Sequence, residues 1–219
     1  MSEAKTIIKI CGITSIEQAL QIAELGVNAI GVISVKESPR YVPNKRKEDI
    51  FKNLKKCHPK VKRVSIVKNQ PLNLFKSNLN SENVIQLHGD EDVDYCKSLR
   101  ARTPQIELWK AFRIKERKDI DKVEIYSDFV DTFLLDSWNK DTYGGSGIRI
   151  QPKYLKGLLF SKPWLLAGGI SADWIKQIIK DIKPDGIDIS SSIESSPGIK
   201  DIEKTKNIIR LIRKRDILK

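Results

Sequence analysis

Near its middle the sequence reads Phe133-Leu-Leu-Asp-Ser-Trp-Asn-Lys-Asp-Thr-Tyr-Gly-Gly-Ser-Gly147. An apolar run ends at an acid, Asp136, and a polar loop then leads to three glycines around a serine. Burying an unpaired carboxylate costs several kcal/mol, so an acid is expected where a strand leaves the core. Glycines just beyond it let backbone N–H groups approach an anion. The pattern predicts a strand end at the edge of an active site.

Similar apolar segments recur along the whole chain. The expected strands are residues 7–10, 29–35, 61–67, 84–87, 107–112, 129–135, 163–167 and 186–189. Segments compatible with helices follow them, at residues 16–23, 45–57, 72–78, 93–99, 120–126, from 152 onward, 173–180 and 204–219. Most strand starts lie 22 or 23 residues apart, which is the length of one compact βα unit. The longer intervals, of 32 to 34 residues, leave room for long loops after the second and sixth strands.

Eight βα units in a chain of this length are what a closed parallel barrel requires. The alternative is an open, doubly wound sheet, but the near-regular repeat carries no dinucleotide-binding glycine fingerprint. We therefore predict an α/β protein with a single (βα)8 TIM barrel, forming one catalytic domain over residues 1–219.

The composition favours a globular protein of the cytoplasm. Of the 219 residues, 40% are hydrophobic and 31% are charged, which is typical of a chain with a packed core. No apolar run approaches the ~20 residues of a membrane span, and the N-terminus lacks the pattern of a signal peptide. The three cysteines, Cys11, Cys57 and Cys96, are odd in number and lack metal-ligand spacing. Neither a disulfide framework nor a metal site is expected.

The formal net charge of +12 raises the alternative of a nucleic-acid-binding protein. Lys and Arg are scattered, however, and no nucleic-acid-binding motif accompanies them. The densest basic segment, residues 204–219, has an apolar helical stripe, so its charges are expected to be a solvated helix face. Purely electrostatic binding would be nonspecific and would disappear from a gel-shift assay at physiological salt. A positive field also suits a small anionic substrate.

Residues with reactive or polar side chains gather at the expected strand ends. In a parallel barrel all these ends meet on one face, which is where active sites lie. The residues expected there are Cys11, Arg40, Asn69, His88, Arg113, Asp136, Gly168, Gly169 and Ser190–Ser192. The last two groups follow strands seven and eight, where barrels commonly hold a phosphate.

Six motifs in this order resemble those of the phosphoribosylanthranilate isomerases, the barrel enzymes of tryptophan biosynthesis. They are Lys9-Ile-Cys-Gly-Ile-Thr14, Ser38-Pro-Arg-Tyr-Val42, Gln86-Leu-His-Gly-Asp-Glu91, Leu134-Leu-Asp136 with Gly144-Gly-Ser-Gly147, Leu166-Ala-Gly-Gly-Ile170, and Asp188-Ile-Ser-Ser-Ser-Ile-Glu-Ser-Ser-Pro-Gly198. The resemblance covers nearly the whole chain. One departure is that the family usually has Lys after Gly-Gly-Ser-Gly, where this chain has Ile148.

The resemblance implies an Amadori rearrangement of N-(5'-phosphoribosyl)anthranilate to the 1-deoxyribulose phosphate. Cys11 matches the general base that removes the C2 proton, and Asp136 matches the general acid that protonates the ribose ring oxygen. Arg40 matches the residue that binds the anthranilate carboxylate. The resemblance also implies that no cofactor or metal takes part.

Further residues are expected to contact the substrate. Gly168, Gly169, Asp188 and Ser190 match the phosphate end of the family's site, and Ser191 lies beside them. His88 and Arg113 are the remaining substrate-binding candidates. The expected partner is a small substrate with a phosphate and a carboxylate, bound by a monomer or homodimer that has no specific nucleic-acid or membrane partner.

The reaction makes demands on both catalytic candidates. Free Asp has a pKa of about 3.9, so only about one in 10³ carries a proton at pH 7. Asp136 must therefore lie in a desolvated or substrate-covered position. Free Cys, with a pKa of about 8.5, is only a few per cent thiolate, so Cys11 should benefit from nearby cations.

The alternative enzyme function is that of another class of sugar-phosphate barrel. The aminoimidazole-ribotide isomerases of histidine synthesis are similar sugar-phosphate barrels, but they generally use two aspartates. An Asp would then stand where this chain has Cys11. The thiol argues against that chemistry.

Overall fold

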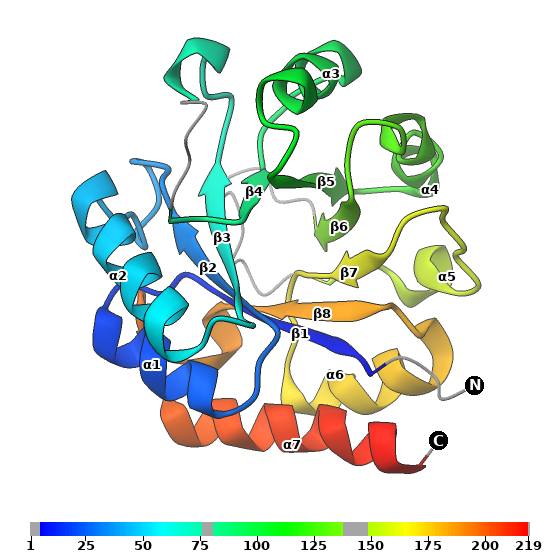
Figure 1. Ribbon diagram of the computed structural model, residues 1–219. Helices are drawn as coiled ribbons and strands as arrows, with labels where there is room; N and C mark the ends of the chain where they lie inside the picture. The colour runs from blue at the N-terminus through cyan, green and yellow to red at the C-terminus, as the bar shows by residue number, and fades with distance from the viewer. Residues whose placement is uncertain (1–4, 76–80, 138–148, 219) are drawn as a thin grey trace.

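The computed structural model describes residues 5–75, 81–137 and 149–218, which form a closed barrel of parallel strands in chain order (Figure 1). Its strands are β1 (Ile7–Cys11), β2 (Ala29–Ile33), β3 (Lys62–Val67), β4 (Val84–Leu87), β5 (Glu107–Ile114), β6 (Thr132–Ser137), β7 (Trp164–Leu166) and β8 (Gly186–Ile189). The last strand pairs in parallel with the first and closes the barrel. The predicted (βα)8 TIM barrel is thereby confirmed.

Helices and short helical turns surround the strands (Figure 1). The helices are α1 (Ile16–Glu24), α2 (Asn44–Cys57), α3 (Val93–Arg102), α4 (Arg117–Ile120), α5 (Pro152–Leu155), α6 (Ala172–Gln177) and α7 (Ile202–Leu218). Short turns add η1 (Leu72–Leu74), η2 (Glu124–Tyr126), the π-helical η3 (Ile178–Ile182) and η4 (Ser191–Ile193). The helix expected over residues 120–126 is divided between α4 and η2. Of the helix expected over residues 72–78, only the turn η1 lies within the described residues.

The strand ends near the site differ from the prediction. Strand β6 begins at Thr132 rather than at residue 129, because the preceding Asp131 accepts bonds from the Leu108 N–H and the Arg100 guanidinium. It also continues through Asp136 to Ser137, and β5 continues to Ile114. Asp136 is therefore part of the strand and not of the loop beyond it.

Apolar side chains form two cores, one on each face of the barrel wall. The larger core lies between the strands and the helices and includes Phe51, Phe133 and Trp174. The smaller one fills the barrel interior with side chains such as Trp109 and Leu134. Successive residues of a strand point to opposite faces, so residues two apart share one face. Leu134 in the interior therefore places Asp136 on the inner face, at the end of the barrel.

An antiparallel hairpin that the sequence pattern did not reveal follows β8. It consists of β9 (Glu194–Ser196) and β10 (Ile199–Lys200), which pair with each other outside the barrel. Two residues connect them, ending in Gly198, whose φ of 82° is in the left-handed region that favours glycine. The hairpin places two charged residues, Glu194 and Lys200, at the end of β8.

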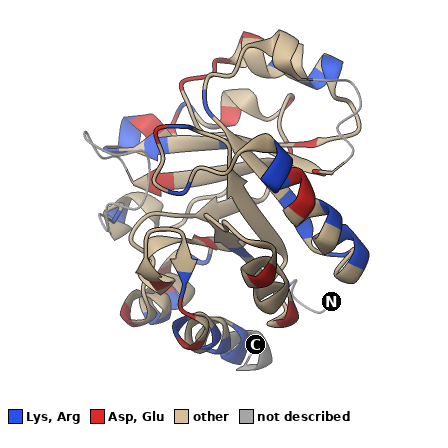
Figure 2. Cartoon of the chain, turned by 90° about the vertical axis from the view of Figure 1, so that its left-hand side faces the viewer, with Lys and Arg blue, Asp and Glu red and all other residues tan. Residues whose placement is uncertain are grey.

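The C-terminal helix packs against the barrel as its sequence pattern predicts. In α7 the side chains of Thr205, Ile208, Ile209 and Ile212 are buried. The guanidinium of Arg213 donates to the Thr6 carbonyl oxygen at 2.8 Å, so part of the basic segment holds the helix against the chain near β1. Elsewhere Lys and Arg alternate with Asp and Glu over several helices (Figure 2). Among the described residues, no helix is both long and apolar enough to cross a membrane.

Replacing Ile212 by Ala should destabilise the protein by about 2–5 kcal/mol, because the substitution leaves a cavity in a fully buried contact. Lys206→Ala, on the exposed face of the same helix, is the matched control and should change the free energy of unfolding by less than about 0.5 kcal/mol. Urea denaturation measures both values. Equal losses in the two variants would contradict this account of how α7 packs.

Candidate active site

A cavity of about 560 Å³ lies at the carboxyl ends of the barrel strands. It brings together nine of the ten site residues expected from the sequence: Cys11, Arg40, His88, Asp136, Gly168, Gly169, Asp188, Ser190 and Ser191. Arg113 is the exception among these ten, because it lines a neighbouring hollow of about 370 Å³ and pairs with Asp90 at 2.6 Å. Asn69, which was also expected at this face, does not line the cavity either.

Cys11 lies beside a buried ion pair that joins the first and last strands. Lys9 and Asp188 are directly opposite each other in the β1–β8 pairing, and the Lys9 Nζ to Asp188 Oδ2 distance is 2.7 Å. Lys9 precedes Cys11 by two residues and so shares its inward face. The second oxygen of Asp188, Oδ1, is buried at the cavity and has no hydrogen-bond partner in the described part of the chain.

Burial and charge act in opposite directions on the Cys11 thiol. Burial raises the pKa of Cys11 above its ordinary value, and the ammonium groups of Lys9 and Lys200 oppose this rise without cancelling it. The cations expected from the sequence are therefore present, but desolvation is the larger effect. Burial also raises the pKa of Asp188, and the ammonium group of Lys9 opposes this rise.

Asp136 lies against neighbours from its own strand, β6, and from the end of β4. Its side chain is buried, and its Oδ1 accepts a hydrogen bond of 2.8 Å from the Ser137 N–H. His88 Nε2, following β4, lies 3.3 Å from Asp136 Oδ2. On the other side of that ring, Gln86 Nε2 lies 2.9 Å from His88 Nδ1. An amide nitrogen donates, so this contact assigns the ring proton to Nε2, which faces Asp136.

Gly168 allows the loop after β7 to approach Asp136 closely. A Cβ at this position would lie 2.4 Å from Ser137 Oγ and 2.8 Å from Asp136 Oδ1. The φ of 83° also lies in the left-handed region. Glycine is therefore required here by space as well as by conformation.

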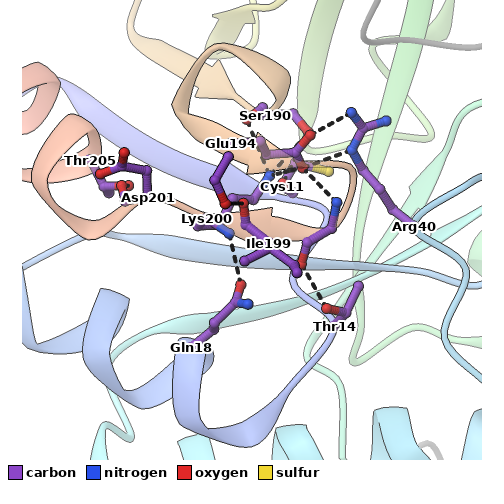
Figure 3. Close-up of polar contacts among 12 residues, drawn as sticks. Cys11, Thr14, Gln18, Arg40, Ser190, Glu194, Ile199, Lys200, Asp201 and Thr205 are labelled. Atoms are coloured by element: carbon purple, nitrogen blue, oxygen red, sulfur yellow. Dashed lines mark hydrogen bonds and ion pairs between the residues drawn. The ribbon is translucent and has the colours of Figure 1, made fainter.

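Arg40 reaches the cavity from the loop after β2 and is held by the hairpin. Its Nε donates to Glu194 Oε1 at 2.8 Å and its Nη2 donates to Glu194 Oε2 at 2.6 Å (Figure 3). Gly12 lies directly against it, since a Cβ there would come within 2.6 Å of Arg40 Cδ. The hydrogen bonds with Glu194 raise the pKa of Arg40, so its guanidinium is permanently charged.

Hydrogen bonds connect the hairpin to β1 and β8 (Figure 3). Lys200 Nζ donates to Glu194 Oε1 at 2.7 Å and to the Ser190 carbonyl oxygen at 3.1 Å. The Ser190 hydroxyl donates to the Cys11 carbonyl oxygen at 3.0 Å, and Thr14 Oγ1 donates to the Gly198 carbonyl oxygen at 2.7 Å. The surroundings of Cys11 and Arg40 are thus parts of one hydrogen-bonded network.

Sequence reasoning missed three residues of this site: Lys9, Glu194 and Lys200. Lys9 carries a signal, because a lysine two residues before Cys11 in a strand must share its face. Glu194 and Lys200 lie in a loop-like segment whose hairpin could not be recognised from apolar periodicity. The Gly144–Gly147 loop, singled out at the start, lies outside the described residues.

Within residues 5–75, 81–137 and 149–218, no three or more His, Cys, Asp or Glu side chains are grouped so that they could hold a metal ion.

Comparison with known proteins gives a consistent family. Residues 8–211 match the family model described as N-(5'phosphoribosyl)anthranilate (PRA) isomerase. The chain is 39% identical to the N-(5'-phosphoribosyl)anthranilate isomerase of Synechococcus elongatus, over 97% of this chain and 98% of that one. The corresponding protein of Sulfurihydrogenibium is 38% identical, over 95% and 100%.

Solved structures agree with these sequence relatives. The phosphoribosyl anthranilate isomerase of Thermotoga maritima superposes with a TM-score of 0.84 at 26% identity, covering 95% of this chain and 99% of that one. Another isomerase of the same name was solved in complex with reduced 1-(o-carboxyphenylamino)-1-deoxyribulose 5-phosphate, and its TM-score is 0.77 at 27% identity, with coverage of 95% and 99%.

The raised pKa of Cys11 predicts how its alkylation rate depends on pH. Only the thiolate reacts, so the rate rises with pH through the pKa, and a raised pKa moves the midpoint above the ordinary value of about 8.5. Lys9→Met should move it higher still, because it removes an ammonium that favours the thiolate.

The measurement uses iodoacetamide in a Cys57→Ser background, because Cys57 is exposed. Cys96 is buried, and burial raises its pKa to about 12, so it should stay unmodified. A Cys11 midpoint below about 8.5, or one that Lys9→Met leaves unchanged, would contradict the described surroundings.

Proposed function

The chain belongs to the N-(5'-phosphoribosyl)anthranilate isomerase family, and from this premise we propose that its cavity carries out the Amadori rearrangement with Cys11 as general base and Asp136 as general acid. The protein is an isomerase of tryptophan biosynthesis. The roles of Cys11 and Asp136 in the reaction are our proposal. We also propose that the barrel acts as one catalytic domain, in the cytoplasm.

One observation carries the assignment: Cys11 and Asp136, a thiol and a carboxyl group that can both transfer protons, line the same cavity. Cys11 has the ammonium groups of Lys9 and Lys200 near it, which favour an anionic thiolate. Asp136 has the imidazole of His88 at 3.3 Å and a second carboxylate, Asp188, close enough for their charges to interact. A general base needs neighbouring cations that favour its anionic form, and Cys11 has them.

The first step opens the ribose ring. In our proposal the Asp136 carboxyl gives its proton to the ring oxygen as the bond between that oxygen and C1 breaks. The anthranilate nitrogen supplies an electron pair to C1, so a protonated imine forms. The position of Asp136, buried and held by the Ser137 N–H, keeps the acid away from bulk water during this transfer.

The second step removes the C2 proton. The Cys11 thiolate accepts it, and the electrons of the C2–H bond move toward the imine to give an enolamine. The enolamine then ketonises to the 1-deoxyribulose phosphate, so that substrate and product are isomers. The positive charge of Lys9 stabilises the thiolate that this step consumes.

The two ends of the substrate carry charges that orient it. We propose that Arg40 binds the anthranilate carboxylate, as the resemblance implies. The backbone at Gly168, Gly169, Ser190 and Ser191 would receive the phosphate, at the loops after β7 and β8. Asp188 is better placed beside the sugar than beside the phosphate, because its unpartnered Oδ1 can accept a hydrogen bond from a hydroxyl and repels an anion.

In this scheme His88 lies beside Asp136 and faces the substrate. Its Nε2 is 3.3 Å from Asp136 Oδ2 but has no hydrogen-bond partner in the described part of the chain, and Gln86 fixes the ring from behind. Arg113 has no place in the proposed substrate site, since it lines the neighbouring hollow.

The remaining proposals concern partners. A solved relative was studied as monomers derived from a dimeric phosphoribosylanthranilate isomerase, so a monomer or a homodimer is proposed for this chain as well.

The histidine-pathway reaction is the second enzyme candidate, and the thiol at Cys11 disfavours it.

The assignment is tested by following the loss of fluorescence of N-(5'-phosphoribosyl)anthranilate. Cys11→Ser and Asp136→Asn should each lower kcat by about 10²–10⁴-fold, because each removes one proton transfer. Cys57→Ser and Asp128→Asn change the same residue types at exposed positions and should retain wild-type turnover. Undiminished turnover in Cys11→Ser or Asp136→Asn would refute that residue's role, and an inactive wild-type protein would refute the function.

A further inference from the structure

Three charged side chains lie buried together at the wall of the cavity, and their charges do not cancel. Arg40 and Lys200 are 9% and 4% exposed, and the side chain of Glu194 is 5% exposed. Two cations therefore share one anion, which leaves a formal charge of +1 on the buried trio. A buried charge without a counter-charge is costly unless something completes it.

The carboxylate of Glu194 is the shared centre of the trio. Its Oε1 accepts hydrogen bonds from Arg40 Nε at 2.8 Å, Lys200 Nζ at 2.7 Å and the Gly198 N–H at 3.2 Å. Its Oε2 accepts from Arg40 Nη2 at 2.6 Å. These bonds lower the pKa of Glu194 despite its burial, so the carboxylate is ionised.

Lys200 is placed beneath this carboxylate and away from the cavity. Arg40 lines the cavity, whereas Lys200 does not. The Lys200 backbone N–H donates to Gln18 Oε1 at 3.2 Å, which anchors the residue to α1 (Figure 3). The cation that reaches the cavity and the cation that neutralises Glu194 are thus different residues.

A bidentate Arg–Glu pair alone would be neutral and would attract an anion weakly. We propose that Lys200 is a positioning residue that neutralises Glu194, so that Arg40 is held rigidly by the carboxylate yet keeps its positive charge for the carboxylate of the substrate. This inference deepens the proposed function, since it assumes that the ligand presents a carboxylate to Arg40. Glu194 then fixes the direction of the Arg40 side chain. The negative charge of Glu194 alone would cancel the positive charge of Arg40, and the ammonium group of Lys200 compensates for it.

Two single variants and their double variant test the proposal through charge. Lys200→Met makes the trio neutral, Glu194→Gln makes it +2, and the double variant restores the wild-type +1. The probe is reduced 1-(o-carboxyphenylamino)-1-deoxyribulose 5-phosphate, and its Kd is measured by titration calorimetry, which does not depend on turnover. Lys200→Met should raise Kd by about tenfold or more, as for other buried charge partners. The double variant should return to within about threefold of wild type.

A purely structural role gives a different pattern. If Lys200 only supports the hairpin, the double variant loses more contacts than either single variant and should bind at least as weakly as Lys200→Met. That result, or an unchanged Kd in Lys200→Met, would overturn the proposal. If Lys200→Met does not fold, Lys200→Gln, which keeps a hydrogen-bond donor but no charge, replaces it and should raise Kd by about tenfold or more. Lys200→Arg keeps the charge and should rescue binding.

A second probe separates this inference from the proposed function. The same reduced compound without the carboxylate should bind all variants within about twofold of one another, because the charge of Arg40 no longer has a partner. If Lys200→Met raises the Kd of this probe as much as it raises the Kd of the carboxylated probe, the inference is overturned. Absence of isomerase turnover in the wild-type protein would refute the proposed function alone, because both Kd series are read without catalysis.

Discussion

The buried ion pair between Lys9 and Asp188 joins the first strand of the barrel to the last, and the site is built around it. At 2.7 Å the two charges compensate each other in a place where either alone would cost several kcal/mol. The register that closes the barrel sets the two residues opposite each other. Cys11 follows Lys9 on the same face, and the Ser190 hydroxyl beyond β8 bonds the Cys11 carbonyl. Closing the barrel therefore also assembles the surroundings of the thiol.

Charge is distributed unevenly around the resulting cavity. The ammonium groups of Lys9 and Lys200 lie near Cys11, whereas Asp136 has the imidazole of His88 beside it. We propose that this arrangement orients a substrate that has an anionic group at each end and the reacting sugar between them. Gly168 and Gly12 allow it at the backbone level, because a side chain at either position would collide with Asp136 or Arg40.

The barrel was predictable from the sequence because strand spacing and apolar periodicity are local signals that recur every βα unit. Cys11, Asp136 and Gly168 were predictable for a related reason, since a strand end in a parallel barrel has a known place in space. Glu194 and Lys200 were not, because their place at the site follows from the contact of Glu194 with Arg40, which is 154 residues away in the chain. Arg113 lies near the end of a strand as expected, but its side chain pairs with Asp90 outside the main cavity. The sequence pattern indicates the backbone position of Arg113 but not this side-chain contact.

The central claim is that Cys11 and Asp136 act on one sugar held between Arg40 and the loops after β7 and β8. A crystal structure with reduced 1-(o-carboxyphenylamino)-1-deoxyribulose 5-phosphate bound tests it most directly. The account predicts the ligand carboxylate on Arg40, the phosphate at Gly169 and Ser190, and Cys11 Sγ within about 4 Å of C2, with Asp136 within hydrogen-bond distance of the oxygen released from the ring. A ligand bound in the reverse direction, or one that contacts only one of the two residues, would contradict it.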